Sequence, residues 1–384
     1  MTALILALSL NVAGQPIVVN SLASLRAAVQ SATPGATVLL APGTYTGGIF
    51  LSDIHGQAGQ PITIAGQSST NPPIIQDGST AFQISKTSHI VLRDFVIRRM
   101  ANNGINIDDG GVRTQPSHHI RIERLDVSEL PTGIHDGIKL SGVDDFVVQD
   151  CIVKAWGGSA IDMVGCHKGV IRACLFQNGG DSGVQAKGGS SDVAVYGCRF
   201  VDYGQRGVNL GGSTDFEFFR PPIETMTEKY EAKNLTVEGC TFVRGRAPVA
   251  FVGVDRATVA YCTIYQPERW AMRILQETVA AGFVPCRSGA FRKNLVVFTS
   301  TQWGEGGVNI GPNTYPRSFR FEGNFWYCTD RPDRSTPTLP TAEIGGTYGV
   351  NPQATLVPPG TVTVPSNSPA RAIGAHAWVE GKSR

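Results

Sequence analysis

The chain has little net charge and no long apolar run beyond its first residues. Its 384 residues contain 33 Lys and Arg against 31 Asp and Glu, a formal net charge of +2 at pH 7. So small a charge argues against a general nucleic-acid or membrane-surface partner. No apolar stretch after the first residues has the length needed to span a bilayer. We therefore expect no nucleic-acid partner and no membrane span.

Several binding and catalytic motifs are also missing. No P-loop, nucleotide-binding glycine fingerprint, zinc motif or serine-hydrolase elbow occurs in a suitable strand-to-helix context. The eight cysteines lack the CxxC spacing of a zinc site. No repeat contains a segment long enough for a crossover helix, which excludes doubly wound and barrel α/β folds.

The sequence does contain a repeat built from two strand types. The longer type occurs at HIVLRDFVI, HIRIERLDV, FVVQDCIV, GVIRACLF, DVAVYGCRF, NLTVEGCTF and ATVAYCTI. The shorter type lies between these runs, at GINID, GIKLS, AIDMV, GVQAK, GVNLG, MRIL and GVNIG. Where no longer loop intervenes, the repeat is about 22 to 24 residues, too short for a β-propeller blade of about 40 residues. The pattern predicts an all-β fold, a single-stranded right-handed parallel β-helix or solenoid.

Cysteines mark the register of this repeat. Equivalent positions of the longer strand hold Cys151, Cys174, Cys198, Cys240 and Cys262, and then Asn294 and Asn324. These positions alternate with apolar neighbours on an inward face, so we expect a ladder of buried free thiols rather than a metal site.

We expect one β-helix domain over residues 15–384. An apolar run followed by small residues makes 1–14 a candidate signal peptide, and the mature protein would then be secreted or periplasmic. SLASLRAAVQSA has apolar residues at helical spacing and predicts an N-terminal capping helix. The cap would cover about 15–60, the coils about 61–330 and a closing segment about 331–384.

The repeats, the cap and the closing SPARAIGAHA together resemble the pectin-lyase-like superfamily of right-handed parallel β-helix proteins. Within it, GVQAKGGSSDVAVYGCRF around Lys187 resembles the catalytic-lysine segment of polysaccharide lyase family six, which includes chondroitinase B and alginate lyases. That family places a catalytic arginine one coil after its lysine. The directly aligned segment here is GVNLGG, with Arg206 a few residues early, and the family's acidic calcium ligands reduce to Asp181. The resemblance implies cleavage of a uronic-acid-containing polysaccharide.

The repeat register also places polar residues in columns on one face. The first column is Asn106, Lys139, Asp162, Gln185 and Asn209, extended by Arg273 and Asn309. A neighbouring column is Asp108, Ser141, Val164 and Lys187, and the preceding turns present His135, Asp181, Gln205 and Arg246. The cluster spans about four coils, roughly 15 to 20 Å, which is the length of a short oligosaccharide. The inserted loop 213–232 carries aromatic residues that would form a sugar-stacking wall.

Cleavage of a uronate by β-elimination needs a base beside the carboxylate and a cation that neutralises it. The residues assigned to catalysis are Lys187, Arg206 and His135. Those assigned to substrate binding are Lys139, Gln185, Asn209, Arg246 and Arg273. Calcium, which prefers hard carboxylate oxygens, would be bound by Asp136, Asp162 and Asp181. The expected partner is an anionic polysaccharide bound by a monomer, with no other cofactor.

Two other kinds of function stay open. The three aspartates on successive coils also suit an inverting glycoside hydrolase, and a uronan epimerase shares the first proton abstraction. A non-catalytic glycan-binding or structural β-helix protein is the third hypothesis, because fold alone does not determine function. A concave groove at Lys187, walled by loop 213–232, would favour an enzyme over these binding proteins.

Overall fold

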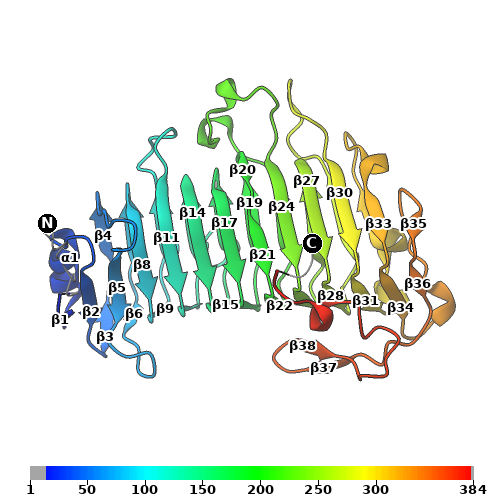
Figure 1. Cartoon of the computed structure of the whole chain (residues 1–384), viewed down its shortest axis with the longest axis horizontal. Coiled ribbons are helices and arrows are strands. Elements are labelled where there is room, and N and C mark those ends of the chain that lie inside the picture. Colours follow the sequence, from blue (N-terminus) through cyan, green and yellow to red (C-terminus); the bar gives the residue numbers. More distant parts are fainter. Residues whose placement is uncertain (1–13, 382–384) are drawn as a thin grey trace, which may run out of the picture.

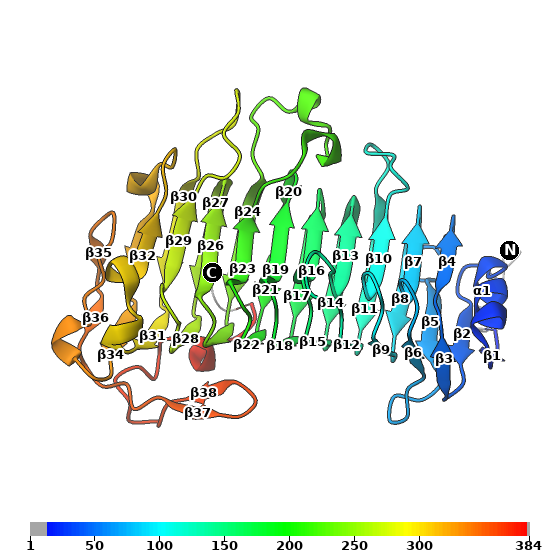
Figure 2. The same cartoon turned by 180° about the vertical axis from the view of Figure 1, so that it is seen from behind.

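The computed structural model describes residues 14–381, so all of the candidate signal peptide except Gly14 lies outside the described residues. The chain forms an elongated stack of coils from the N-terminal to the C-terminal end (Figures 1 and 2). Three parallel sheets run along the stack. The predicted right-handed parallel β-helix is confirmed. Within residues 14–381, no helix has the length and apolarity needed to cross a membrane.

Sheet A faces the viewer in Figure 1. Its strands are β1 (Ile17–Val19), β2 (Thr37–Leu40), β5 (Ile62–Gly66), β8 (Ser88–Arg93), β11 (Ser117–Glu123), β14 (Val143–Gln149), β17 (His167–Arg172), β20 (Ser190–Ser191), β21 (Ala194–Tyr196), β24 (Ala232–Glu238), β27 (Val254–Ala260), β30 (Arg287–Arg292), β33 (Arg320–Glu322) and β35 (Glu343–Ile344).

Sheet B lies along the lower edge in Figure 1. Its strands are β3 (Thr44–Thr46), β6 (Ile74–Gln76), β9 (Val96–Arg98), β12 (Asp126–Ser128), β15 (Ile152–Lys154), β18 (Leu175–Gln177), β22 (Arg199–Val201), β25 (Thr241–Val243), β28 (Thr263–Tyr265), β31 (Leu295–Phe298), β34 (Phe325–Cys328) and β36 (Thr347–Tyr348).

Sheet C faces the viewer in Figure 2 and carries most of the predicted site residues. Its strands are β4 (Ile49–Ser52), β7 (Phe82–Ser85), β10 (Ile105–Asp108), β13 (Ile138–Ser141), β16 (Ser159–Val164), β19 (Ser182–Lys187), β23 (Arg206–Gly211), β26 (Ala247–Val252), β29 (Met272–Leu275) and β32 (Val308–Ile310).

The longer strand type of the sequence is in fact two strands. HIVLRDFVI, for example, contains most of β8 and most of β9, which belong to different sheets. The bend between them contains Asp94, whose φ of 64° lies in the left-handed region. The bend is short, and the side chains on both sides of it are buried in the core: Ile90, Leu92, Phe95 and Ile97. Because the apolar pattern continues through the bend, the sequence does not show where sheet A ends and sheet B begins.

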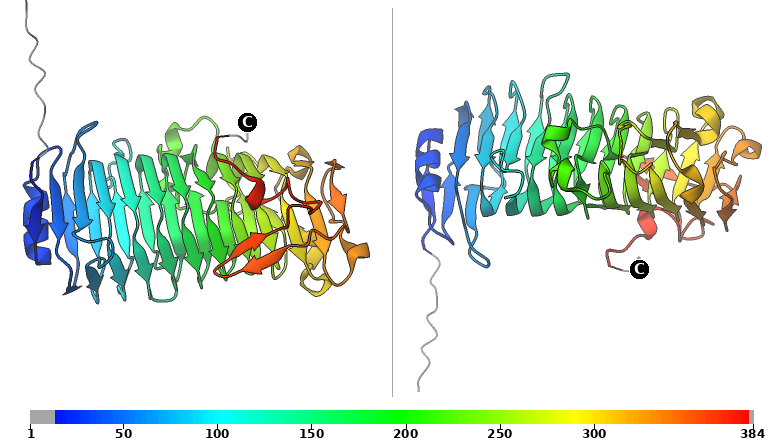
Figure 3. Two further views of the ribbon diagram at one scale, coloured as in Figure 1. Left: turned by 60° about the horizontal axis from the view of Figure 1, so that its bottom comes forward. Right: turned by 90° about the horizontal axis from the view of Figure 1, so that it is seen from above.

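The segments near the two ends of the chain cover different parts of the coil stack. The predicted capping helix is α1 (Leu22–Gln30), which begins at the N-cap residue Ser21 and buries Leu25 and Val29 in the core. At the other end, the antiparallel hairpin of β37 (Thr355–Val357) and β38 (Thr361–Thr363) folds back along sheet B (Figure 3). Val362 packs there against sheet B side chains. The closing segment thus covers part of sheet B.

Short 3₁₀ helices occur in the loops and near the C-terminus. They are Phe216–Phe218, Ile223–Thr225, Ser300–Gln302, Gly304–Gly307, Pro316–Ser318, Pro332–Arg334 and Ala375–Ala377.

The predicted cysteine ladder is confirmed, because all eight cysteines are free and buried. Where the ladder changes to asparagine, the Asn294 side chain accepts the backbone N–H of Cys262 at 2.8 Å and donates to Asn324 at 3.0 Å. Burial raises the pKa of Cys166 and of Cys286 to about 12, so both thiols stay protonated at neutral pH.

Aromatic stacking in the core gives a first testable prediction. The rings of Phe176, Phe200 and Phe242 stack across three coils, with centroid distances of 4.9 and 4.7 Å. Phe242→Leu should lower the free energy of unfolding by about 1–2 kcal/mol, through lost contacts and a small cavity. Chemical denaturation measures this change. Phe50→Leu, at a side chain that is 49% exposed, is the control and should change stability by less than about 0.5 kcal/mol; equal effects would contradict the packing argument.

Candidate active site

The two predicted columns on sheet C are confirmed by strand register. Asn106, Lys139, Asp162, Gln185 and Asn209 are successive partners in parallel pairing. Ala250 then separates Asn209 from Arg273 and Asn309. The second column runs through Asp108, Ser141, Val164 and Lys187.

A pocket of about 520 Å³ lies over the ends of β10, β13, β16 and β19. Lys139 and Lys187 line it from sheet C, and Phe218 and Arg220 line it from the loop between β23 and β24. This loop rises from the coil stack near the middle of the molecule (Figure 1). The predicted concave site walled by the loop is therefore present, and Phe218 is the aromatic residue that lines it.

Lys139 is held as a fixed cation at this site. Its Nζ lies 3.2 Å from Asp136 Oδ2 and 2.5 Å from Asp162 Oδ2, and both aspartates are buried. Burial opposes the charge on the amine, but the two carboxylates outweigh it and raise the pKa of Lys139 to about 12. Lys139 therefore stays protonated at neutral pH and can stabilise a substrate carboxylate.

The same contacts do not fit the predicted calcium site. The ammonium group of Lys139 stands between Asp136 and Asp162, where a shared cation would bind. Asp181 lies exposed in the turn before β19 and does not join them. Calcium takes six to eight oxygen ligands, and these three carboxylates do not converge.

Lys187 is the less constrained of the two lysines. Its Nζ lies 3.9 Å from Asp162 Oδ1, beyond hydrogen-bond distance, and it has no hydrogen-bond partner among residues 14–381. Asp162 Oδ1 is likewise buried without a hydrogen-bond partner in this part of the chain. A loosely held amine in a pocket, next to a fixed cation, is suited to exchanging a proton with a bound substrate.

Glu231, which the sequence analysis missed, anchors the loop beside Lys187. Its buried carboxylate accepts the backbone N–H of Gly188 at 3.1 Å, the hydroxyl of Thr214 at 2.8 Å and the hydroxyl of Thr278 at 2.5 Å. These bonds connect both ends of the loop to the residue after Lys187. In the sequence, the only feature that could have indicated this role is the position of Glu231, immediately before β24.

Arg206 is not the neighbour of Lys187 that the family pattern implies. Arg206 pairs with Ser182, the first residue of β19, whereas Lys187 is the last. Five residue steps along a strand separate the two Cα positions by about 16 Å. Arg206 instead donates to Asn209 at 3.1 Å and to Glu277 at 2.6 Å. Arg206 and Lys187, the predicted catalytic pair, are therefore separated by the length of a strand. An alignment of short sequence segments does not show this separation.

A second basic group surrounds Trp270. The guanidinium groups of Arg246, Arg269 and Arg273 lie 5.5, 4.5 and 4.6 Å from the indole ring. Burial, with the charges of Arg206 and Arg246, lowers the pKa of Arg273. Positive charges held this close together favour binding of an anion.

The remaining predicted residues lie mainly where the sheet C strands begin. His135 precedes β13 and lies 3.2 Å from the side-chain oxygen of Asn102. The Gln185 side chain accepts the Ser159 hydroxyl at 3.3 Å, and Asn209 is buried. The predicted site therefore separates into a pocket group, Lys139 and Lys187, and a strand-start group that includes His135, Asp181, Arg206 and Arg246.

Comparisons with known proteins support the fold. Residues 110–220 match the family described as right handed beta helix region. No curated protein matches the sequence significantly.

Solved structures show the same architecture at low identity. An alginate lyase from Paenibacillus sp. str. FPU-7 has 16% identity and a TM-score of 0.55, over 77% of this chain and 99% of that one. The PL6 family alginate lyase AlyGC has 11% identity and a TM-score of 0.50, over 95% of this chain and 57% of that one. The A-module of the Azotobacter vinelandii mannuronan C-5 epimerase AlgE6 has 14% identity and a TM-score of 0.52, over 86% of this chain and 96% of that one. The predicted resemblance to the pectin-lyase-like β-helix proteins, including a lyase of family six, is thus confirmed for the fold.

Proposed function

We propose that this protein is a polysaccharide lyase that cleaves a uronic-acid-containing polysaccharide by β-elimination along the outer face of sheet C. One observation carries the proposal: the amine of Lys187, held only by a 3.9 Å contact with Asp162, shares a loop-walled pocket with the fixed cation of Lys139. A base and a carboxylate-binding cation are the two groups that this reaction requires.

The distribution of basic residues supports an anionic polymer as the substrate. From Lys139 on β13 to Arg273 on β29 the face crosses six strands, a length of about 24 Å at about 4.8 Å per coil. Arg246 and Arg273 continue the positive charge beyond the pocket, next to Arg206, which is paired with Glu277. A chain of several uronate units would contact both basic groups at once, with the cleaved bond at the pocket.

The reaction follows from the positions of the two lysines. The unprotonated amine of Lys187 removes the proton from the carbon beside the uronate carboxylate, while Lys139 stabilises the negative charge that develops on that carboxylate. The electron pair of the broken C–H bond forms a carbon–carbon double bond. The glycosidic C–O bond then breaks, and the departing oxygen takes a proton from the Lys187 ammonium group or from water. The products are an unsaturated uronate and a new hydroxyl end.

The test is to incubate the purified protein with alginate, pectate and chondroitin sulfate and to follow the ultraviolet absorbance of the unsaturated product. We expect absorbance to rise with at least one of these polymers. Because Lys139 occupies the space between Asp136 and Asp162, the rate should be unchanged by a chelator. Absence of unsaturated product from every uronan would overturn the proposal.

Other outcomes of the same incubation identify the alternatives. An epimerase would use the same proton abstraction but would change the configuration of the uronate, which proton NMR detects, without an absorbance change. A glycoside hydrolase would release reducing ends without unsaturation. The latter is less suited to this site, because Lys139 bridges the two buried aspartates that would have to act on water. Binding without any product would indicate a glycan-binding protein.

We propose that this activity operates outside the cytoplasm, in the periplasm or after secretion, and that the protein acts as a monomer. The apolar N-terminal run of the sequence supports export. Cell fractionation and size-exclusion chromatography with light scattering test these two points.

A further inference from the structure

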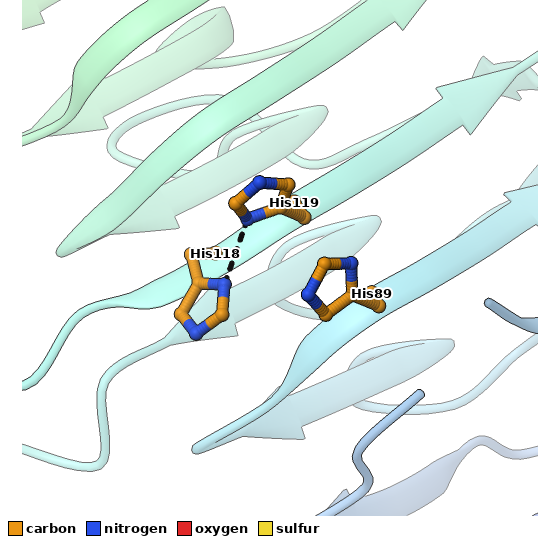
Figure 4. Close-up of side chains that lie close together, drawn as sticks. All are labelled: His89, His118 and His119. Atoms are coloured by element: carbon orange, nitrogen blue, oxygen red, sulfur yellow. Dashed lines mark hydrogen bonds between the residues drawn. The ribbon is translucent and has the colours of Figure 1, made fainter. Parts of the chain in front are cut away.

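Three histidines come together on sheet A, on a different face from the proposed lyase site. His89 lies in β8, and His118 and His119 lie in β11, the next strand of the sheet. One potential ligand nitrogen from each lies within 4.8 Å of the other two. Figure 4 shows the three rings gathered at one point above the strands. Within residues 14–381, no other set of three histidine, cysteine or carboxylate side chains comes this close together.

A residue with left-handed backbone conformation, found at the same position of successive coils, explains how two successive residues can contribute to one cluster. In a regular strand, neighbouring side chains point to opposite faces. His119 instead has a φ of 57° and lies between His118 and Ile120, both of which pair in register with the adjacent strands. Ile120 is buried in the core, whereas His118 and His119 both remain partly accessible. His89 occupies the equivalent position of the preceding coil and has the same backbone conformation, with a φ of 53°. Its side chain therefore lies beside those of His118 and His119.

The contacts among the rings favour neutral imidazoles. His118 Nδ1 lies 2.8 Å from His119 Nδ1, a distance at which one nitrogen must donate and the other accept. The rings of His89 and His119 stack at a centroid distance of 4.3 Å. Neutral imidazole is the form that binds a metal ion.

A partly buried carboxylate, that of Asp144, lies on the strand next to the cluster. Asp144 is the direct partner of His118 on the following strand, β14. Its Oδ1 is buried and has no hydrogen-bond partner in the described part of the chain. A carboxylate in this position can orient a ligating imidazole or take a place in the coordination sphere.

We propose that His89, His118 and His119 form a binding site for a divalent transition-metal ion, with Zn²⁺ as the preferred ion. Imidazole nitrogens suit zinc, copper and nickel, whereas calcium and magnesium prefer oxygen ligands. Zinc–nitrogen bonds of about 2.0–2.1 Å in a tetrahedral site require the three nitrogens to lie about 3.4 Å apart. The three nitrogens already lie within 4.8 Å of one another, so side-chain rotation is the only movement needed to reach this geometry. The fourth position is then open to water or to Asp144.

This site does not depend on the proposed lyase activity. Asp109 lines both the pocket at Lys187 and a separate hollow that reaches His118, so the loop between β10 and β11 stands between the two sites. Loss of zinc binding and loss of lyase activity can therefore be measured separately.

Calorimetric titration of the untagged full-length protein with zinc chloride at neutral pH tests the proposal. We expect one saturable site, and a loss of affinity of at least about 10-fold in each of His89→Ala, His118→Ala and His119→Ala. X-ray absorption of the zinc-loaded wild type should show three imidazole ligands. Affinity should decrease as the pH is lowered, because protons compete for the ring nitrogens.

His376→Gln is the matched control, since this exposed histidine lies in the C-terminal segment and contacts Ala370. It should bind zinc as the wild type does. Circular dichroism of each metal-free variant verifies that the coil stack is intact. The proposal is overturned if the wild type shows no saturable binding, or if the triple alanine variant binds zinc with wild-type affinity.

Discussion

Lys187→Ala should lower kcat for formation of unsaturated uronate by about 10²–10⁴-fold, which is the contribution of a well-placed general base. The variant should fold normally. Lys187 Nζ has no hydrogen-bond partner among the described residues, and its contact with Asp162 is 3.9 Å long. Initial rates on the responsive uronan measure the loss, and thermal unfolding verifies the fold.

Two further variants distinguish a base from a simple positive charge. Lys187→Arg keeps the charge, but a guanidinium group does not give up its proton near neutral pH, so this variant should be as inactive as Lys187→Ala. Lys154→Ala, at a partly exposed lysine paired with Asp126 on sheet B, should be fully active. If Lys187→Arg retains most of the activity, the residue acts through its charge and the base is elsewhere, with His135 as the next candidate.

The fold could be predicted well from the sequence, because every coil must bury its apolar side chains in the same way. Each strand must bury alternate residues, and each position contacts its equivalent in the next coil, so the cysteine ladder and the columns from Asn106 to Asn209 follow from alignment of the repeats alone. The division of the longer runs into sheets A and B could not be seen, because a single left-handed residue such as Asp94 turns the chain without breaking the apolar pattern.

The candidate site was predicted only in part, since its assembly depends on contacts that do not repeat. Alignment of the repeats correctly predicted that Lys139 lies beside Asp162. It did not separate Arg206 from Lys187, because these two residues lie at opposite ends of neighbouring strands. The hydrogen bonds of Glu231 come from an inserted loop and have no equivalent in other coils. Such contacts leave no periodic signal in the sequence.

The loop that walls the pocket is fastened to the coil stack by a buried ion pair. Arg220 Nε and Nη2 donate to the two carboxylate oxygens of Asp109 at 2.6 and 2.8 Å, and Nη1 donates to the backbone oxygen of Phe218 at 2.8 Å. Both side chains are almost fully buried. On its way to Asp109, the arginine side chain packs against Gly142 and Gly165, where an added Cβ would lie within 2.6 Å of it. The pair therefore fixes the position of Phe218 over the pocket.

Arg220→Met should destabilise the protein by about 3–5 kcal/mol, because it leaves the carboxylate of Asp109 buried without a counter-charge. It should also raise KM for the polysaccharide, since the wall of the pocket loses its attachment. Denaturant unfolding and steady-state kinetics measure the two effects. The matched control is Arg244→Met, which breaks an exposed ion pair with Asp202 and should cost less than about 1 kcal/mol.

The double variant Asp109→Leu with Arg220→Met separates the ion pair from the packing. Removing both charges removes the buried, uncompensated carboxylate, so most of the lost stability should return. KM should nevertheless stay high, because the bond from Arg220 to Phe218 is still missing and the loop is no longer fixed. If the double variant is as unstable as Arg220→Met alone, the cost comes from packing against the two glycines rather than from the isolated charge. If KM returns to the wild-type value together with stability, the loop does not form part of the substrate site.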